Sequence, residues 1–165
     1  MNTNENTIIV AARSAIRDYK KYNCYICQEN RNFRTNSNYM AFYYNNKIST
    51  TVPKILGYID SINLKNPNLD NINIVNVSSD INELKERLKL FLDAISANNP
   101  WIISCNKIIF LTSPTDIRTI NLSHEIINNK TDKSGKKRVP YTQSNRYSTI
   151  SKLQCSYLTT ELENN

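Results

Sequence analysis

Short apolar runs alternate with polar segments along this chain, and most of the runs are too short to be helices. Residues 8–12 and Cys24–Gln28 are typical of buried strands, and residues 13–21 between them have helical character. An aromatic run at 39–44 resumes after an Asn-Asn pair, the composition of a tight turn, so residues 39–48 are predicted to form a β-hairpin. The first part of the chain is therefore predicted to be mostly strand.

The middle of the chain continues this pattern. In residues 52–64 the isoleucines fit either the helical or the strand period, but Gly57 and the β-branched residues favour a strand. Pro67 marks a loop at 66–71, and residues 72–77 alternate like a further strand. Two later apolar segments predict one strand and one less regular strand, at 107–112 and 116–122.

The clearest helix is predicted at residues 80–97. Its apolar residues recur every three or four positions, so they form one stripe along an amphipathic helix. Ser79, Asp80 and Glu83 supply the polar side chains that cap helix N-termini, and Pro100 follows the end of the segment. The residues predicted to face the core are Ile81, Leu84, Leu88, Phe91, Leu92 and Ile95.

A basic segment precedes the last predicted elements. Residues 130–138 contain five Lys or Arg residues around Gly135 and no apolar residue that would anchor them. A mobile basic loop is therefore predicted at 129–139. Ser148 is predicted to open a short helix that runs to Leu153.

Length and composition define the class of protein. The chain has 165 residues, so a single α+β domain over 1–165 is predicted, with a disordered polar tail at 1–7. No stretch reaches the roughly 20 apolar residues that span a bilayer, and the first residues lack the regions of a signal peptide. Four cysteines do not form the dense framework of a small secreted fold. A cytoplasmic protein with reduced thiols and no membrane partner is expected.

The charge and the tyrosines change this picture. Lys and Arg number 21 against 14 Asp and Glu, and the net charge of +7 favours polyanionic partners, although many soluble proteins carry such charge as a solvated surface. The chain also has ten tyrosines, many of them next to basic residues. Flat rings beside cations suit stacked bases and phosphates, whereas the same rings can fill a small β core with their hydroxyls at its rim.

The cysteines were considered as metal ligands. Cys24 and Cys27 have the form of half a zinc site, which would need two further ligands from Cys105, His124 and Cys155. Residues three apart in an extended strand point to opposite faces, so this pair cannot chelate one ion without a tight turn. Buried thiols are the simpler interpretation, and no metal is expected.

The sequence contains no convincing set of catalytic residues. Asp70 followed by Glu83 and Lys85 matches the pattern of a PD-(D/E)xK nuclease, but Glu83 has a capping role in the predicted helix and Lys85 a solvent face. The single histidine, His124, stands outside any nucleophile motif, and two glycines in the whole chain exclude Gly-rich phosphate loops. No catalytic residue and no cofactor are predicted, and a binding protein is favoured over an enzyme.

Landmarks along almost the whole chain follow a familiar order. Residues 8–13 read Ile-Ile-Val-Ala-Ala-Arg, 39–48 hold the aromatic hairpin, and apolar residues are spaced along 52–62. Near the end, an Arg-Tyr-Ser-Thr segment at 146–153 precedes a Thr-x-x-Leu at 159–162. Together these landmarks resemble PUA-like modules of the EVE and ASCH kind, which occur alone or attached to restriction and phage-defence proteins.

The resemblance implies both a fold and a ligand. It implies a small, strongly bent PUA-like β-barrel with flanking helices, into which the helix at 80–97 is inserted. It also implies a cleft that accepts a base, sometimes a modified one, flipped from its strand, and a larger defence or restriction complex as a partner. Relatives often carry a Pro and an acidic pair near residues 12–15, which this chain lacks, so the identity of the ligand stays open.

The leading hypothesis is a binding module for nucleic acid or a nucleotide, in a defence or counter-defence setting. The side chains expected to bind the ligand are Arg13, Tyr25, Arg34, Tyr43, Arg146 and Tyr147. The basic loop is expected to add phosphate contacts without sequence selectivity, through Lys133, Lys136, Lys137 and Arg138. The alternatives are a non-catalytic protein-interaction or nucleotide-sequestering protein of phage or bacterial origin and, third, a metal-dependent nuclease.

Overall fold

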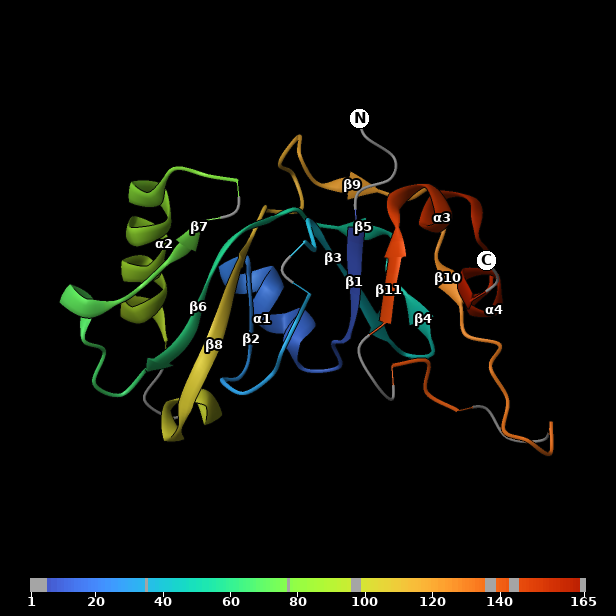
Figure 1. Cartoon of the computed structure of the whole chain (residues 1–165), viewed down its shortest axis with the longest axis horizontal. Coiled ribbons are helices and arrows are strands. Elements are labelled where there is room, and N and C mark those ends of the chain that lie inside the picture. Colours follow the sequence, from blue (N-terminus) through green and yellow to red (C-terminus); the bar gives the residue numbers. More distant parts are fainter. Residues whose placement is uncertain are drawn as a thin grey trace. The chain divides into compact units, whose positions relative to one another are not determined.

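The chain forms two compact units in an α+β fold, as the sequence predicted for its class. The computed structural model describes residues 6–34, 36–76, 78–95, 99–135, 139–142 and 146–163 (Figure 1). Unit 1 consists of Met1–Ile16, Phe33–Lys54 and Ser113–Asn165. Unit 2 consists of Arg17–Asn32 and Ile55–Thr112.

Unit 1 is built on a five-stranded sheet that curls like half a barrel (Figure 1). Its strands lie in the order β10-β4-β3-β1-β11. Their bounds are Asn6–Ala11 for β1, Tyr39–Tyr44 for β3, Lys47–Ile48 for β4, Ile126–Ile127 for β10 and Arg146–Thr149 for β11. A separate pair joins β5 (Thr51–Val52) to β9 (Ile120–Asn121).

Strand β1 has a central place in this sheet. It runs parallel to β3, with Ala11 opposite Tyr43, and antiparallel to β11, with Ile9 opposite Arg146. Two segments from the first third of the sequence and one from its end are thereby hydrogen-bonded side by side. The segments that carry the predicted ligand residues Tyr43 and Arg146 thus lie on either side of one strand.

The turn between β3 and β4 explains why the hairpin could be predicted from sequence. Asn45 and Asn46 have φ angles of 49° and 61°, in the left-handed region. Asparagine tolerates this region better than other residues with a side chain, and two such residues in succession give the tight turn that matches the strand twist. The predicted hairpin at 39–48 is confirmed.

Two short helices complete unit 1: α3 (Ile150–Cys155) and α4 (Thr159–Glu163). The side chain of Thr149 caps α3 by accepting a hydrogen bond from the backbone N–H of Lys152. Ile150, Leu153 and Leu162 from these helices join the buried cluster of the sheet. The helices therefore close one face of the curled sheet by burying apolar side chains.

Unit 2 is an antiparallel sheet with helices. Its strands lie in the order β2-β8-β6-β7. They are β2 (Cys24–Gln28), β6 (Ile55–Asn63), β7 (Val75–Asn76) and β8 (Cys105–Leu111). The helical elements are α1 (Ala15–Tyr22), which begins in unit 1, η1 (Leu69–Asn71), α2 (Ile81–Ala94) and η2 (Pro100–Ile103).

Helix α2 confirms the strongest prediction from periodicity. Leu84, Leu88 and Phe91 are buried in one cluster with side chains of β2, β6 and β8. Asp80 caps the helix by accepting a hydrogen bond from the N–H of Asn82, so the helix begins at Ile81. It ends at Ala94, and residues 96 and 97 of the predicted range lie outside the described residues.

Several predicted boundaries were wrong. The strand predicted at 72–77 is only β7, and the one predicted at 52–64 is divided, because Pro53 has no N–H to donate in a sheet. Ser148 lies in β11, and the helix begins two residues later. The apolar segment at 116–122 contributes only β9. Among the described helices, none combines the length and apolar character that crossing a membrane requires.

Candidate functional site

An open pocket of about 410 Å³ lies within unit 1. Four separate parts of the chain contribute to it: the segment after β2, the segment after β10, strand β11 with the turn before it, and helix α4. Three of the lining side chains are cationic, two are tyrosines and one is a carboxylate. The lining residues are Arg34, Lys130, Tyr141, Arg146, Tyr147, Leu162 and Glu163.

The first wall is a stacked pair of side chains. The guanidinium carbon of Arg34 lies 4.2 Å from the ring centroid of Tyr147. The backbone N–H of Arg34 also donates to the Tyr147 hydroxyl, at 3.2 Å. Tyr147 is held in turn by β11, where it stands opposite Ile8 of β1. A cation over the face of a ring is attracted by the ring's quadrupole, so this wall presents a flat, positively charged surface.

The second wall pairs Arg146 with Tyr141. The Nε of Arg146 donates to the Tyr141 carbonyl at 3.0 Å, and the guanidinium carbon lies 5.3 Å from the Tyr141 ring centroid. Burial, with a contribution from Glu163, raises the pKa of Tyr141 to about 12, and nearby Arg146 offsets only part of this. Tyr141 is therefore a neutral hydroxyl at physiological pH and can act as a hydrogen-bond donor.

A single carboxylate bridges two of the cations. Oε1 of Glu163 lies 2.8 Å from Nζ of Lys130 and 3.4 Å from Nη1 of Arg146. All three side chains keep about a third of their surface exposed, so water screens these ion pairs and their net stabilisation is small. The carboxylate offsets part of the positive charge of Lys130 and Arg146.

A buried hydrogen-bond network around Asn128 connects the segments that line the pocket. The side-chain amide of Asn128 donates to the Tyr43 hydroxyl at 2.9 Å and to the Val139 carbonyl at 2.8 Å. Its oxygen accepts hydrogen bonds from the N–H of Lys130 and the hydroxyl of Thr159. Asn128 thus ties together the segments that carry Lys130, Tyr141 and helix α4. A buried amide with its donors and acceptors paired holds such segments in one arrangement.

The structure brings together three of the ligand residues expected from sequence: Arg34, Arg146 and Tyr147 line the pocket. Tyr43 is buried, with its ring centroid 6.2 Å from that of Tyr141. Its hydroxyl accepts a hydrogen bond from the side-chain amide of Asn128, so it belongs to the buried network and not to the pocket lining. Arg13 is exposed in the turn after β1 and does not line the pocket.

Tyr25, the remaining expected ligand residue, belongs to unit 2. Only 2% of its surface is exposed, and its hydroxyl accepts a hydrogen bond of 2.7 Å from Nη1 of Arg31. Burial raises the pKa of this hydroxyl above its ordinary value. A ring buried to this degree lacks an open face on which a base could stack, and its place is in the core of unit 2.

The predicted basic loop is described only in part. Lys133 is exposed, in a turn where the Asp132 carboxylate accepts hydrogen bonds from the N–H and hydroxyl of Ser134. Gly135 follows with φ at 72°, a conformation that favours glycine. The N–H of Val139 donates to the Lys130 carbonyl and closes the base of the loop. Lys136, Lys137 and Arg138 lie outside the described residues.

Sequence reasoning missed Lys130, Tyr141 and Glu163 as pocket residues. Lys130 belongs to the predicted basic loop, and Glu163 directly follows the Thr-x-x-Leu landmark at 159–162, which carries no charge signal of its own. Tyr141 follows Pro140 in a segment with no regular period. Only the adjacency of Tyr141 to a basic segment, the signal used for the other tyrosines, could have indicated it.

The cysteine pair has the environment of core residues. Cys24 and Cys27 are buried in β2, and burial raises the pKa of Cys24 to about 12 and that of Cys27 to about 11. Both are therefore protonated at neutral pH, whereas a metal ligand is a thiolate. No group of three or more His, Cys, Asp or Glu side chains in the described part of the chain is arranged to hold a metal ion.

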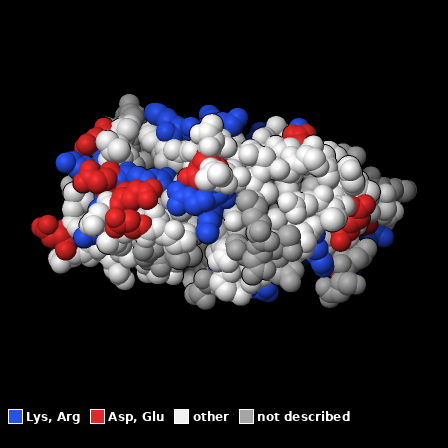
Figure 2. All heavy atoms as spheres, turned by 90° about the horizontal axis from the view of Figure 1, so that it is seen from above, with Lys and Arg blue, Asp and Glu red and all other residues white. Residues whose placement is uncertain are grey.

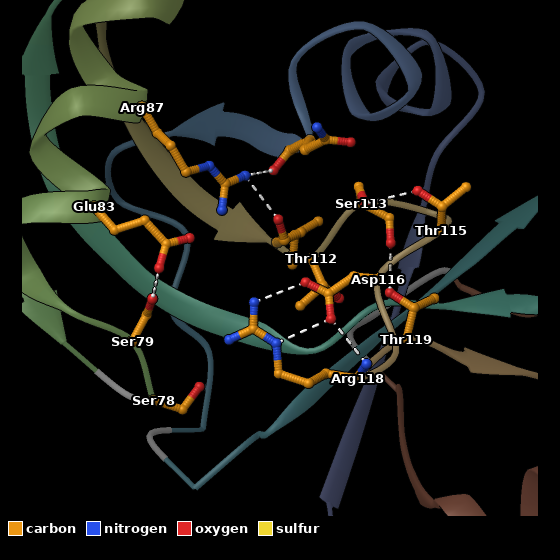
Figure 3. Close-up of polar contacts among 12 residues, drawn as sticks. Ser78, Ser79, Glu83, Arg87, Thr112, Ser113, Thr115, Asp116, Arg118 and Thr119 are labelled. Atoms are coloured by element: carbon orange, nitrogen blue, oxygen red, sulfur yellow. Dashed lines mark hydrogen bonds and ion pairs between the residues drawn. The ribbon is translucent and has the colours of Figure 1, made fainter.

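Other polar clusters serve the scaffold of each unit (Figure 3). In unit 2, the Ser79 hydroxyl donates to the Glu83 carboxylate at 2.7 Å. Glu83, which the nuclease-like sequence pattern would use as a metal ligand, thus takes part in a local contact at the start of α2. In unit 1, Arg118 donates to both carboxylate oxygens of Asp116, at 3.0 and 2.7 Å. These contacts fix the ends of local segments.

Charge elsewhere on the surface is mixed. On the face drawn in Figure 2, Lys and Arg side chains stand beside Asp and Glu side chains in several places. In unit 1, Lys47 pairs with Glu125 at 2.7 Å, a pair much like Lys130 and Glu163 but outside the pocket. The pocket of unit 1 differs from this pair in bringing three cations together around one carboxylate.

Two further pockets lie in unit 2. One, of about 280 Å³, has Lys21 and Arg87 at an apolar rim, but Nη2 of Arg87 donates to the carbonyls of Asn23 and Leu111. The other, of about 290 Å³, is lined mainly by asparagines between residues 63 and 73. Neither combines three cations with two tyrosines, so the pocket of unit 1 is the best candidate site.

The molecule is thus an α+β protein with a cationic, tyrosine-lined pocket in one of its two units. No protein-family model, no curated protein and no solved structure matches this chain. The chemistry of the pocket is accordingly the basis on which a function can be argued.

Proposed function

We propose that unit 1 binds a nucleotide or nucleic acid in the pocket formed around Arg34, Lys130, Arg146, Tyr141 and Tyr147. The observation that carries the proposal is the convergence of three cations and two tyrosines from segments that are far apart in sequence. Phosphate groups need positive charge with N–H donors, and bases need flat surfaces for stacking. This pocket offers the cations together with one stacking surface, the partly exposed Tyr147 and the Arg34 guanidinium on it, whereas the Tyr141 ring is only 2% exposed.

The stacked pair gives the proposal its geometry. With Arg34 over Tyr147, a base can stack against the guanidinium plane or the ring, and both surfaces accept any base. Stacking of this kind is worth about 1–3 kcal/mol per base. Lys130 and Arg146 are placed to contact a phosphate beside it. Such a site binds nucleotides through shape and charge, and selects between bases only by further contacts.

Binding is the proposed role because the titratable groups of the pocket favour it over catalysis. The lysine and arginines are cations, Tyr141 keeps its proton, and Glu163 is held between two cations. A general base must be able to take up a proton near the operating pH. The pocket residues therefore suit the recognition of an anion better than proton transfer.

The finer parts of the hypothesis remain proposals as well. We propose that unit 1 is a PUA-like module that accepts a flipped or modified base in a defence or counter-defence setting. The support is the order of landmarks along the sequence and the curled sheet in which β1, β3 and β11 are neighbours. Comparing DNA with and without modified cytosine in the assay below tests the ligand of this module.

The proposal is tested by titrating nucleotides, single-stranded DNA and single-stranded RNA into the protein, with fluorescence anisotropy or calorimetry as the readout. Arg34→Ala and Tyr147→Ala are each expected to weaken binding about tenfold, because each removes a stacking surface. Tyr157→Ala removes an exposed tyrosine of unit 1 that lies outside the pocket and is the matched control.

Three results separate the possibilities. If Tyr157→Ala or the exposed Arg13→Ala weakens binding as much as the pocket variants, the positive charge acts diffusely and the pocket is not the site. If free nucleotides bind as tightly as strands, the protein sequesters nucleotides. A protein that binds none of these ligands would contradict the proposed function.

A further inference from the structure

We infer that the pocket selects a terminal phosphate, a phosphomonoester on a strand end or a free nucleotide, over the phosphodiesters inside a strand, and that Glu163 is its internal competitor. This inference rests on the proposed function, since it specifies which chemical group of the ligand the cations recognise. Three observations in the pocket support it.

The first observation is the position of the Glu163 carboxylate. One of its oxygens contacts both Lys130 and Arg146, at 2.8 and 3.4 Å. Two cations that share one anionic oxygen form the arrangement in which a phosphate oxygen is also bound. A ligand phosphate that contacts these cations must therefore displace a group of charge −1.

The second observation is the third cation. Arg34 also lines the pocket, and its guanidinium lies over the ring of Tyr147. A phosphodiester carries one negative charge, as the carboxylate does. Replacing the carboxylate by a phosphodiester therefore adds little electrostatic attraction to the cations. A phosphomonoester carries about −1.5 to −2 at neutral pH and has three acceptor oxygens, so it can engage Lys130, Arg146 and Arg34 together.

The third observation is that Glu163 can leave without disturbing the core. Helix α4 is anchored by Thr159 and Leu162, which are buried, whereas the Glu163 side chain is a third exposed. Its displacement breaks two ion pairs that water screens. The carboxylate thus competes with a ligand anion for Lys130 and Arg146, and a ligand with more negative charge displaces it more readily.

The test uses single-stranded oligonucleotides of about 12 nucleotides, labelled at the 3′ end, with either a 5′-phosphate or a 5′-hydroxyl. The wild-type protein is expected to bind the phosphorylated strand about tenfold more tightly. Lowering the pH from about 7.5 to about 5.5 should reduce this preference, because the second pKa of a phosphomonoester is about 6. Adenosine monophosphate and adenosine, added as competitors, show whether a free nucleotide suffices.

The role of Glu163 is tested with a matched pair of variants. Glu163→Gln is expected to raise the affinity for both strands about three- to tenfold, because no carboxylate has to be displaced. Glu125→Gln removes the same charge from the Lys47 pair outside the pocket and is expected to change affinity less than twofold.

The outcomes distinguish this inference from the proposed function. If both strands bind equally and Glu163→Gln behaves like Glu125→Gln, while Arg34→Ala still weakens binding, the inference is wrong and the function stands. If neither strand and neither nucleoside compound binds, the proposed function fails and the inference fails with it. A 5′-phosphate preference with a gain in affinity for Glu163→Gln alone supports both.

Discussion

Each unit places an arginine against an aromatic ring, but the two guanidinium groups have different surroundings. In unit 2, Arg87 lies 5.8 Å from the Phe110 ring centroid, and its Nη2 donates to the carbonyls of Asn23 and Leu111 at 2.9 and 2.7 Å (Figure 3). In unit 1, Arg34 lies 4.2 Å from the Tyr147 ring centroid and lines an open pocket. The first guanidinium is hydrogen-bonded to the backbone, and the second is exposed at the pocket.

An arginine beside an aromatic ring can therefore be a scaffold residue or an exposed surface of a pocket. Arg87 donates to two partly buried backbone carbonyls at strand ends, so its removal takes a charged donor from both, although the Asn23 carbonyl keeps the hydrogen bond from the N–H of Leu111. The exposed guanidinium of Arg34 stacks on the Tyr147 ring, while its backbone N–H donates to the Tyr147 hydroxyl. A sequence pattern of tyrosines and cations cannot separate these cases, since the difference lies in the acceptors that the fold brings to the guanidinium.

The largest expected effect concerns the packing of unit 2. Leu88→Asp places a charge in the cluster beneath helix α2, where Leu88 is 3% exposed, and is expected to lower the free energy of unfolding by about 4 kcal/mol or to prevent folding. Leu90→Asp, on the same helix but 66% exposed, should change stability by about 0.5 kcal/mol or less. Equal losses in urea unfolding would show that the helix is not docked as described.

The next effect tests Arg87 as a scaffold residue. Arg87→Ala is expected to cost about 2–3 kcal/mol of unfolding free energy, because it removes charge-assisted hydrogen bonds to two carbonyls. Its affinity for nucleotides, measured per folded molecule, should stay within twofold of wild type. A large loss of affinity at unchanged stability would reverse the roles assigned to the two arginines.

The fold could be predicted where a local rule decides it. Helix α2 follows from its apolar period and the Asp80 cap, and the β3–β4 hairpin follows from Asn45 and Asn46. The order of strands could not be predicted, because β1 pairs with β3 and β11, and nothing local in residues 8–12 specifies partners so distant in sequence. The PUA-like form of unit 1 stays a prediction.

The candidate site was predictable only in its residue types. Tyrosines beside basic residues indicated Arg34, Arg146 and Tyr147, which the fold brings into one pocket. The same rule selected Tyr25, which the fold buries in unit 2 with Arg31 on its hydroxyl. Burial is a tertiary property, so the adjacency of a ring and a cation in sequence could not distinguish the two outcomes.

A smaller effect appears in the pH dependence of stability. The folded-state pKa values of Cys24 and Cys27, about 12 and 11, lie above the ordinary value near 9 because of burial. Their stabilisation is therefore complete below about pH 9 and is lost as the pH rises above it, at up to about 1.4 kcal/mol per pH unit for each thiol. Urea unfolding between pH 8 and about 10 measures this slope.

Variants identify the thiols responsible. Cys24→Ala should reduce the slope, whereas Cys155→Ala should leave it unchanged, because Cys155 is exposed and belongs to unit 1. In the native protein a thiol reagent is expected to modify Cys155 rapidly, and Cys24 only on unfolding. Rapid modification of Cys24 under native conditions would contradict its place in the core of unit 2.

The smallest expected effect concerns the surface ion pair outside the pocket. Lys47→Gln breaks the pair with Glu125 and should change the unfolding free energy by about 0–1 kcal/mol, since both side chains are well exposed. Its affinity for nucleotides should stay within about twofold of wild type. A larger change in either quantity would mean that this pair has a role like that of Lys130 and Glu163.

The measurement that tests the central claim most directly compares Lys130→Gln with Lys47→Gln in binding a 5′-phosphorylated single strand at about 50 and 200 mM salt. The two lysines form ion pairs of 2.8 and 2.7 Å with similar exposure, and only Lys130 lines the pocket. Lys130→Gln is expected to weaken binding about tenfold and to reduce its salt dependence, whereas Lys47→Gln should match wild type. Equal affinities and equal salt dependence for the two variants would contradict the assignment of the pocket as the binding site.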